Sequence, residues 1–261
     1  MNTQLVVDHI VSWLKNYAEN AHSNGFVVGV SGGIDSAVTS KLCALTGLKT
    51  LCLEMPIHQS SDQVSRARKH IDSLELKHGN VSSKEIELTN IFDSFVKSLP
   101  TPQDREFHEF SLVNARARMR MTTLYYFAAL KKFLVAGTGN KVEDFGVGFY
   151  TKYGDGGVDL SPIADLNKTE VYTLGGYLEI IPEIMNAPPT DGLWGDNRTD
   201  EDQIGASYPE LEWAMDFNGS ENEISDRQRE VLDIYNRLHN QNKHKMTPIP
   251  VCDVPQDLKK S

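Results

Sequence analysis

The chain has 261 residues, enough for one large α/β domain or two small ones, and we expect a single domain over residues 1–261. It carries 26 Lys and Arg against 36 Asp and Glu, a formal net charge of −10, which argues against a general nucleic-acid or membrane-surface binder. No stretch approaches the roughly 18 apolar residues of a membrane-spanning helix, and the three scattered cysteines suit a reduced compartment. We therefore expect a cytoplasmic protein.

The first half of the chain predicts a β-α-β unit. Apolar residues at helical spacing predict a helix that opens the chain and ends near Asn24. A strand over 26–30, a helix over 36–45 and a strand over 50–54 follow, in the order of a parallel, right-handed unit. A further helix begins near residue 60, and a short third strand is expected around Ile86.

The second half predicts longer helices and irregular segments. Residues 99–110 hold two prolines and no periodicity, which predicts a loop or a lid. Helices are expected over 112–131, 167–180 and 224–241, with an apolar strand from residue 133. The alternation predicts an α/β fold with a Rossmann-like, mostly parallel sheet flanked by helices.

A glycine turn between the first strand and its helix is the most informative motif. Residues 31–36 read Ser-Gly-Gly-Ile-Asp-Ser, and such turns expose backbone N–H groups at the positive end of a helix dipole, which suits a phosphate. The turn lacks G-x-G-x-x-G spacing and a Gly-Lys-Ser/Thr ending, so neither a dinucleotide fingerprint nor a Walker loop is favoured. An acid beside phosphates requires a cation between them, so we interpret Asp35 as a magnesium ligand.

A second strand-to-glycine turn lies about 105 residues further on, at residues 137–143. It places the Thr138 hydroxyl and the Glu143 carboxylate just past a predicted strand. Ligands collect at the carboxyl ends of parallel strands, so both turns are expected to edge one crevice, where Glu143 would complete the magnesium site opposite Asp35. Glycines then surround Lys152, Asp155, Asp159 and Lys168, which indicates close backbone approach to an anionic ligand.

These motifs carry a family resemblance. The first turn resembles the pyrophosphate loop of ATP pyrophosphatases, which cleave ATP between the α and β phosphates. The motifs GTGN-x-x-E, TKYGDGG-x-D and L-x-K, with NARARMRMTTLYY before them and PPTDGLW, DEDQIGASY and a terminal HK after them, resemble NAD synthetase of the ammonia-dependent type. They span most of the chain in the family's order, and the resemblance implies an adenine nucleotide α-hydrolase-like fold.

The resemblance also implies roles for individual residues. ATP, a co-substrate, is expected at Gly29, Val30, Ser31, Gly32, Gly33, Ile34, Asp35, Ser36, Thr138, Lys168 and Thr190. Deamido-NAD is expected at Arg120, Lys152, Asp159, His244 and Lys245. Asp155 and Lys168 are the expected catalytic residues, and magnesium, the cofactor, falls to Asp35 and Glu143. On a helix, alternate residues point about 200° apart, so Arg116, Arg118 and Arg120 cannot all serve the ligand, and we favour Arg120.

The implied reaction joins ammonia to deamido-NAD through an acyl-adenylate and releases NAD, AMP and pyrophosphate. The chain has no room for a glutaminase domain, so free ammonia is the expected donor unless a separate amidotransferase delivers it. A homodimer is expected, with the helices near 3–23 and 111–131 as possible contacts. Another ATP-pyrophosphatase ligase and a non-catalytic ATP-sensing module stay open as alternatives. Glu54 and Asp191 depart from the pattern, because each adds an acid near the expected nucleotide pocket.

Overall fold

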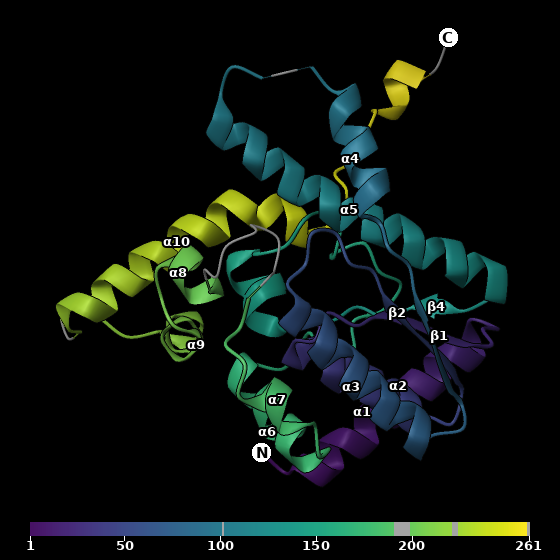
Figure 1. Ribbon diagram of the computed structural model, residues 1–261. Helices are drawn as coiled ribbons and strands as arrows, with labels where there is room; N and C mark the ends of the chain where they lie inside the picture. The colour runs from purple at the N-terminus through teal and green to yellow at the C-terminus, as the bar shows by residue number, and fades with distance from the viewer. Residues whose placement is uncertain (101, 191–198, 221–223, 260–261) are drawn as a thin grey trace.

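The computed structural model describes residues 1–100, 102–190, 199–220 and 224–259. Within these ranges a four-stranded parallel sheet with the strand order β3-β2-β1-β4 forms the centre of the molecule (Figure 1). The strands are β1 (Gly25–Gly29), β2 (Lys49–Glu54), β3 (Val81–Glu85) and β4 (Leu134–Val135). The predicted α/β fold with a mostly parallel sheet is thus confirmed.

One face of the sheet is covered by N-terminal and central helices. They are α1 (Thr3–Asn20), α2 (Ile34–Leu45), α3 (Ser61–Lys77), α6 (Lys168–Tyr177) and α7 (Pro182–Met185). Because side chains alternate along a strand, Phe26 and Val28 point to this face, where they are fully buried with Leu42 of α2 and Leu174 of α6. This packing fixes where α2 and α6 begin, and both helices begin at the candidate site.

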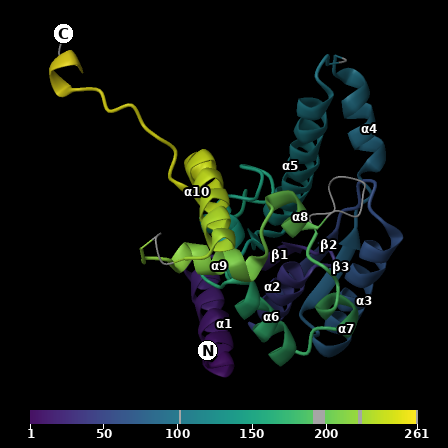
Figure 2. The same cartoon turned by 90° about the vertical axis from the view of Figure 1, so that its left-hand side faces the viewer.

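The opposite face packs against α4 (Thr89–Ser98) and α5 (Arg105–Lys131). Val27 and Leu53 point to this side and share a core with Phe92 and Phe127 of these helices. Figure 2 shows α4 and α5 running together beyond the sheet. The middle of α5 therefore passes the carboxyl ends of β1 and β2.

A third hydrophobic cluster joins a π-helix, η1 (Val142–Val147), to three C-terminal helices, α8 (Asp200–Ile204), α9 (Tyr208–Asp216) and α10 (Asp226–Met246). Val142, Leu211 and Val231 are buried in it. After α10 the chain runs away from the other helices and ends in a short 3-10 helix, η3 (Gln256–Lys259) (Figure 2). The η1 segment is thereby packed against α9 and α10 directly after the second glycine turn.

Several local predictions were wrong. Residues 105–110, expected in a loop, form the first turns of α5, because the Asp104 side chain caps the helix by accepting a hydrogen bond from the Phe107 N–H at 3.2 Å. The expected third strand is present, but it lies earlier than expected and ends at Glu85, just before Ile86. Helix α4 was not among the predicted elements. None of the described helices combines the length and the apolar character that crossing a membrane requires.

Candidate active site

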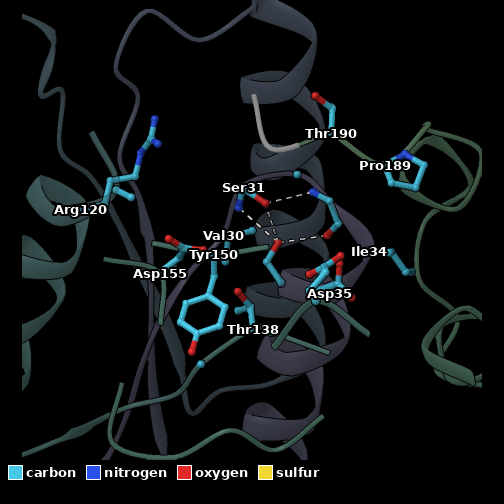
Figure 3. A pocket seen from close by; sticks show the side chains of 18 of the residues that line it. Val30, Ser31, Ile34, Asp35, Arg120, Thr138, Tyr150, Asp155, Pro189 and Thr190 are labelled. Carbon is cyan, nitrogen blue, oxygen red and sulfur yellow. Dashed lines mark hydrogen bonds between the residues drawn. The ribbon is translucent and has the colours of Figure 1, made fainter. Parts of the chain in front are cut away.

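The predicted phosphate loop links the end of β1 to α2 and lines a cavity of about 250 Å³ (Figure 3). The loop is held by its own hydrogen bonds, since the Ser36 hydroxyl donates to the Gly33 carbonyl at 3.0 Å and the Ser31 N–H donates to the Ser36 hydroxyl oxygen at 3.2 Å. Gly32 has a φ of +83°, and a Cβ there would lie 2.6 Å from the Gln63 carbonyl oxygen. Only glycine suits this position.

The two predicted magnesium ligands converge on one ammonium group. Lys168 Nζ lies 2.6 Å from Asp35 Oδ2 and 2.9 Å from Glu143 Oε1. Lys168 is the first residue of α6 and is 3% exposed. Burial alone would lower the pKa of Lys168, but the two carboxylates outweigh this effect and raise it, so the ammonium stays charged. The two glycine turns therefore edge one crevice, as the sequence predicted.

Two side chains that carried no predicted role orient these carboxylates. The Asn140 amide donates to Asp35 Oδ1 at 3.2 Å, and the Tyr208 hydroxyl donates to Glu143 Oε1 at 2.6 Å. Asn140 belongs to the GTGN motif, so its place beside a glycine turn was a usable signal. Tyr208 lies in the DEDQIGASY segment, where nothing in the local pattern indicated a contact with Glu143.

Asp155 lies on another part of the cavity wall. Figure 3 shows Arg120, Tyr150 and Asp155 on one side of the pocket and Asp35, Pro189 and Thr190 on the other. Asp155 Oδ1 accepts a hydrogen bond from the Thr151 N–H at 3.0 Å. Burial raises the pKa of Asp155 to about 6, even though hydrogen bonds to its carboxylate act in the opposite direction.

Other predicted ATP and substrate residues also line this cavity. Thr138 and Thr190 are on its wall, as are all eight residues from Gly29 to Ser36. Arg120 reaches it from α5 and donates to the Met55 carbonyl at 2.9 Å. Arg118 instead donates to the Lys152 carbonyl, which agrees with the opposed directions expected of alternate helix residues.

Four predicted substrate residues, Lys152, Asp159, His244 and Lys245, lie outside the described wall of this cavity. Lys245 Nζ donates to the Gly148 and Tyr150 carbonyls at 2.8 Å each. Lys152 Nζ donates to the His244 carbonyl at 2.8 Å. Asp159 accepts hydrogen bonds from the Tyr125 hydroxyl at 3.0 Å and from the Val135 N–H at 2.8 Å, so it ties α5 to β4. The roles given to these side chains in binding deamido-NAD stay predictions.

Glu54 and Asp191 are the two acids that depart from the expected pattern, and the structure describes the position of Glu54. Glu54 points away from the nucleotide cavity to α3, where it is 2% exposed and pairs with Arg68 at 2.8 Å. It therefore adds no negative charge to the pocket wall. Asp191 lies outside the described residues.

Sequence also missed a basic side chain beside the phosphate loop. Arg66 of α3 lines the cavity, and its Nε donates to the Gly32 carbonyl at 3.4 Å. No motif marks this residue, because its position depends on how α3 packs over the loop. It adds positive charge where phosphate oxygens are expected.

The fold and this site define an ATP-binding α/β enzyme with a pyrophosphate loop. Residues 6–249 match the NAD synthase family. The ammonia-dependent NAD synthetase of Carboxydothermus hydrogenoformans is 35% identical over 247 residues, which cover 94% of this chain and 96% of the relative. The chain belongs to the NAD synthase family, as its motifs predicted, and such enzymes are ligases that form C–N bonds.

Two solved structures resemble the whole chain. The structure of NMN synthetase from Francisella tularensis has a TM-score of 0.86 and 31% identity, and the match covers 97% of this chain and 100% of that one. The structure of the ammonia-dependent NAD synthetase from Campylobacter jejuni has a TM-score of 0.76 and 28% identity, with the same coverage. The two relatives are named for different products, which bears on the substrate.

Proposed function

We propose that the chain amidates deamido-NAD with ammonia, using ATP, and releases NAD, AMP and pyrophosphate. One observation carries the proposal: Asp35 and Glu143, from turns far apart in the sequence, meet at Lys168 beside a serine- and glycine-rich phosphate loop. A polyphosphate chain needs both an anion cradle and a cation-binding group, and these elements supply them at one place.

Asp35 and Glu143 fit a magnesium ion, because two carboxylates directed at one buried point already hold a cation there, the Lys168 ammonium. When bound, the ion would neutralise phosphate charge and polarise the α-phosphoryl group. Lys168 would then be free to donate to a phosphate oxygen. Backbone N–H groups of residues 31–33 would hold the leaving pyrophosphate, and Arg66 would add charge beside them.

The chemistry divides into two balanced steps. A nicotinate carboxylate oxygen attacks the α-phosphorus of ATP, the bond between the α-phosphorus and the bridging oxygen breaks, and pyrophosphate leaves with its electron pair. Ammonia then attacks the acyl carbon, and AMP leaves with the carboxylate oxygen as the amide forms. Asp155, with a pKa of about 6, is suited to receive a proton from the nitrogen as it becomes the nucleophile.

A second substrate is supported by one specific observation. The NMN synthetase from Francisella tularensis superposes on this chain with a TM-score of 0.86. Amidation of the deamidated mononucleotide would use the same carboxylate, the same acyl-adenylate and the same residues. The two candidates differ only in whether an adenylyl half is present on the substrate.

We further propose a cytoplasmic homodimer. All three cysteines are free, as a reducing compartment requires. The helices expected to form the contact expose large apolar side chains, with Trp13 and Tyr17 on α1 and Tyr126 and Leu130 on α5. Such groups at a monomer surface mark a protein interface when they lie together.

The proposal is tested by incubating the chain with ATP, magnesium and ammonium, and with either deamido-NAD or nicotinate mononucleotide. We expect one AMP for each NAD formed, and a kcat/KM at least about tenfold higher for the dinucleotide, the ratio that 1.4 kcal/mol gives. Preference for the mononucleotide would move the assignment to NMN synthesis. AMP formation independent of either pyridine substrate, or ATP binding without cleavage, would overturn the ligase proposal.

A further inference from the structure

The segment that follows α10, residues 248–259, projects from the molecule as an arm (Figure 2). Every residue of the arm is exposed. Within the described part of the chain, the arm forms no hydrogen bond or ion pair with the rest of the molecule, and the Leu258 N–H donates to the Pro255 carbonyl inside the arm. Contacts with its own chain therefore do not hold the arm in place.

The sequence of the arm makes it stiff and apolar. Prolines at positions 248, 250 and 255 fix their own φ and push each preceding residue to an extended conformation. Residues 248–255 accordingly form neither helix nor strand, and a segment of this length spans up to about 28 Å. The arm exposes four large apolar side chains, Ile249, Val251, Val254 and Leu258. A stiff segment loses little conformational freedom when it docks, so the arm is suited to bind a surface.

A second apolar surface lies on the helical hairpin that α4 and α5 form. We call it the hairpin surface, and it consists of the exposed side chains of Ile91, Phe95, Leu99, Phe107 and Phe110. The first three recur every four residues, so they lie on one side of α4 and of the residue that follows it. Phe92 is the residue of α4 that is buried in the core. Exposed apolar side chains that gather in this way mark an interaction site.

The arm and the hairpin surface do not cover each other within one chain. Figure 2 shows the arm leaving α10 on the side away from α4 and α5. Two copies related by a two-fold axis can cover both surfaces at once, because each copy then gives an arm and receives one. The hairpin surface also continues the proposed dimer contact, since Tyr126 and Leu130 are exposed on the same helix, α5.

We propose that the arm of each copy docks on the hairpin surface of a second copy of this chain. The exchange covers the exposed apolar side chains of the arm and of the hairpin surface in both copies. This inference rests on the proposed homodimer and identifies the segments that hold it together. Its test must therefore separate a failure of the exchange from a failure of the homodimer.

Cross-linking tests the contact directly, because Cys252 lies on the exposed arm whereas the other two cysteines are buried. Ser98, seven residues after Ile91, is exposed on the same side of α4, so Ser98→Cys places a thiol beside the hairpin surface. A short bismaleimide should then join two chains into a species of twice the 29.2 kDa mass. Neither Ser98→Cys combined with Cys252→Ser nor Ser65→Cys, on the exposed side of α3, should give this species.

Mixing two variants tests which surfaces pair. Deletion of residues 248–261 removes the arm and keeps the hairpin surface, whereas Phe107→Asp keeps the arm and puts a charge into the hairpin surface. For each variant alone we expect the dissociation constant of the dimer to rise at least about tenfold, because large apolar side chains are no longer buried. An equimolar mixture should form more dimer than either variant alone, since one arm and one hairpin surface are intact in each mixed pair.

Leu76→Asp is the matched control, because Leu76 is exposed on α3 and the change introduces the same charge. It should leave the dissociation constant unchanged.

Three results would overturn the exchange and leave the homodimer standing. They are a cross-link within one chain or none at all, wild-type dimerisation by both variants, and a mixture that associates no better than its components. A wild-type chain that stays monomeric at every concentration measured would refute the homodimer, and the exchange with it.

Discussion

Lys168 holds together two carboxylates that would otherwise repel each other. Its ammonium lies within 2.9 Å of both Asp35 and Glu143, and all three groups are largely buried. The same two carboxylates suit magnesium, so a bound ion would share its ligands with the lysine. Phosphate oxygens are the partner that would let Lys168 leave this position.

Asp35→Ala should abolish magnesium-dependent adenylation. The change removes one of two oxygen ligands and leaves Glu143 alone with Lys168, so the binding point for the ion loses half of its negative charge. We expect pyrophosphate–ATP exchange to fall at least about a hundredfold, a magnitude typical of removing one such electrostatic group. Two quantities are measured: the rate of pyrophosphate–ATP exchange, and magnesium binding by calorimetry in the presence of an ATP analogue. An exchange rate within a few-fold of the wild-type rate would contradict the role of Asp35.

Asp155→Asn should stabilise the protein at pH 7 although it impairs amide formation. The pKa of Asp155 is raised by burial from 3.8 to about 6, so its stabilising contribution is fully present below pH 4 and is lost as the pH rises through about 6. At pH 7 the amide cannot ionise, so the variant should be more stable than wild type, by at most about 3 kcal/mol for this shift. Urea unfolding at pH 4 and pH 7 measures the difference, which should vanish at the lower pH.

The same variant should lose amide formation and keep isotope exchange, because adenylation does not need the proton acceptor. A stability gain that is equal at both pH values, or an equal and mild loss of both activities, would contradict the role given to Asp155.

Sequence could predict those site residues whose position depends on local turn chemistry. Asp35 follows two glycines after a strand, and Glu143 follows the second such turn. The contacts of Tyr208 and Arg66 could not be predicted, because each depends on a helix that packs from a distant part of the chain. The contacts of Asp159 could not be predicted either. Its position in the motif predicted substrate binding and gave no indication that its carboxylate accepts hydrogen bonds from α5 and β4.

At the scale of the elements, the side chains of β2 alternate between two faces of the sheet. This alternation keeps the buried acid Glu54 out of the nucleotide cavity. Leu53 points to the nucleotide cavity, whereas Glu54 points to α3 and pairs with Arg68. Burial raises the pKa of Glu54 although Arg68 acts against this effect. The pair therefore belongs to the scaffold and not to the site.

Arg68→Ala should lower the free energy of unfolding by about 1–3 kcal/mol, because it leaves the buried Glu54 carboxylate without its cation. The loss should be smaller than for a fully buried pair, because Arg68 is partly exposed and solvent screens the interaction. Lys69→Ala is the control on the same helix, since Lys69 and Glu183 form an exposed pair that solvent screens, so its loss should change the free energy of unfolding little. Urea unfolding compares the two. Equal effects, or a loss of kcat in Arg68→Ala at a temperature where it is folded, would contradict this interpretation.

Elements were predictable where periodicity is long and strong, as in α1, β1 and β2. The start of α5 was missed because the prolines before it suggested a loop, although Asp104 is a good capping residue. The π-helix η1 could not be predicted, because its backbone pattern depends on packing against α9 and α10. Tertiary contacts override local preference in both places.

The whole molecule places its ligand site where three hydrophobic clusters meet. The sheet and its two helical layers supply the phosphate loop and Arg120, and the C-terminal cluster supplies the segment with Glu143 and Tyr208. Motif order along the chain predicted this convergence, since both glycine turns follow strands of one parallel sheet. The proposed homodimer belongs to this scale and is tested in solution.

Light scattering coupled to size exclusion should give a mass of twice the 29.2 kDa chain. Tyr126→Glu and Leu130→Glu should shift the protein to monomer, because each buries a charge if α5 forms the contact, and both side chains are more than 60% exposed in the single chain. Leu76→Glu is the control, as Leu76 of α3 is 87% exposed on another helix. A monomeric wild type, or a dimer indifferent to both α5 changes, would refute the dimer or its interface.

Transfer of oxygen from substrate to AMP tests adenylation at this site most directly. Deamido-NAD labelled with oxygen-18 in both nicotinate carboxylate oxygens is converted with ATP, magnesium and ammonium, and the products are analysed by mass spectrometry. We expect one label in each AMP and one in the NAD amide, because the carboxylate attacks the α-phosphorus. Label in phosphate or pyrophosphate, or ADP as the nucleotide product, would contradict cleavage between the α and β phosphates.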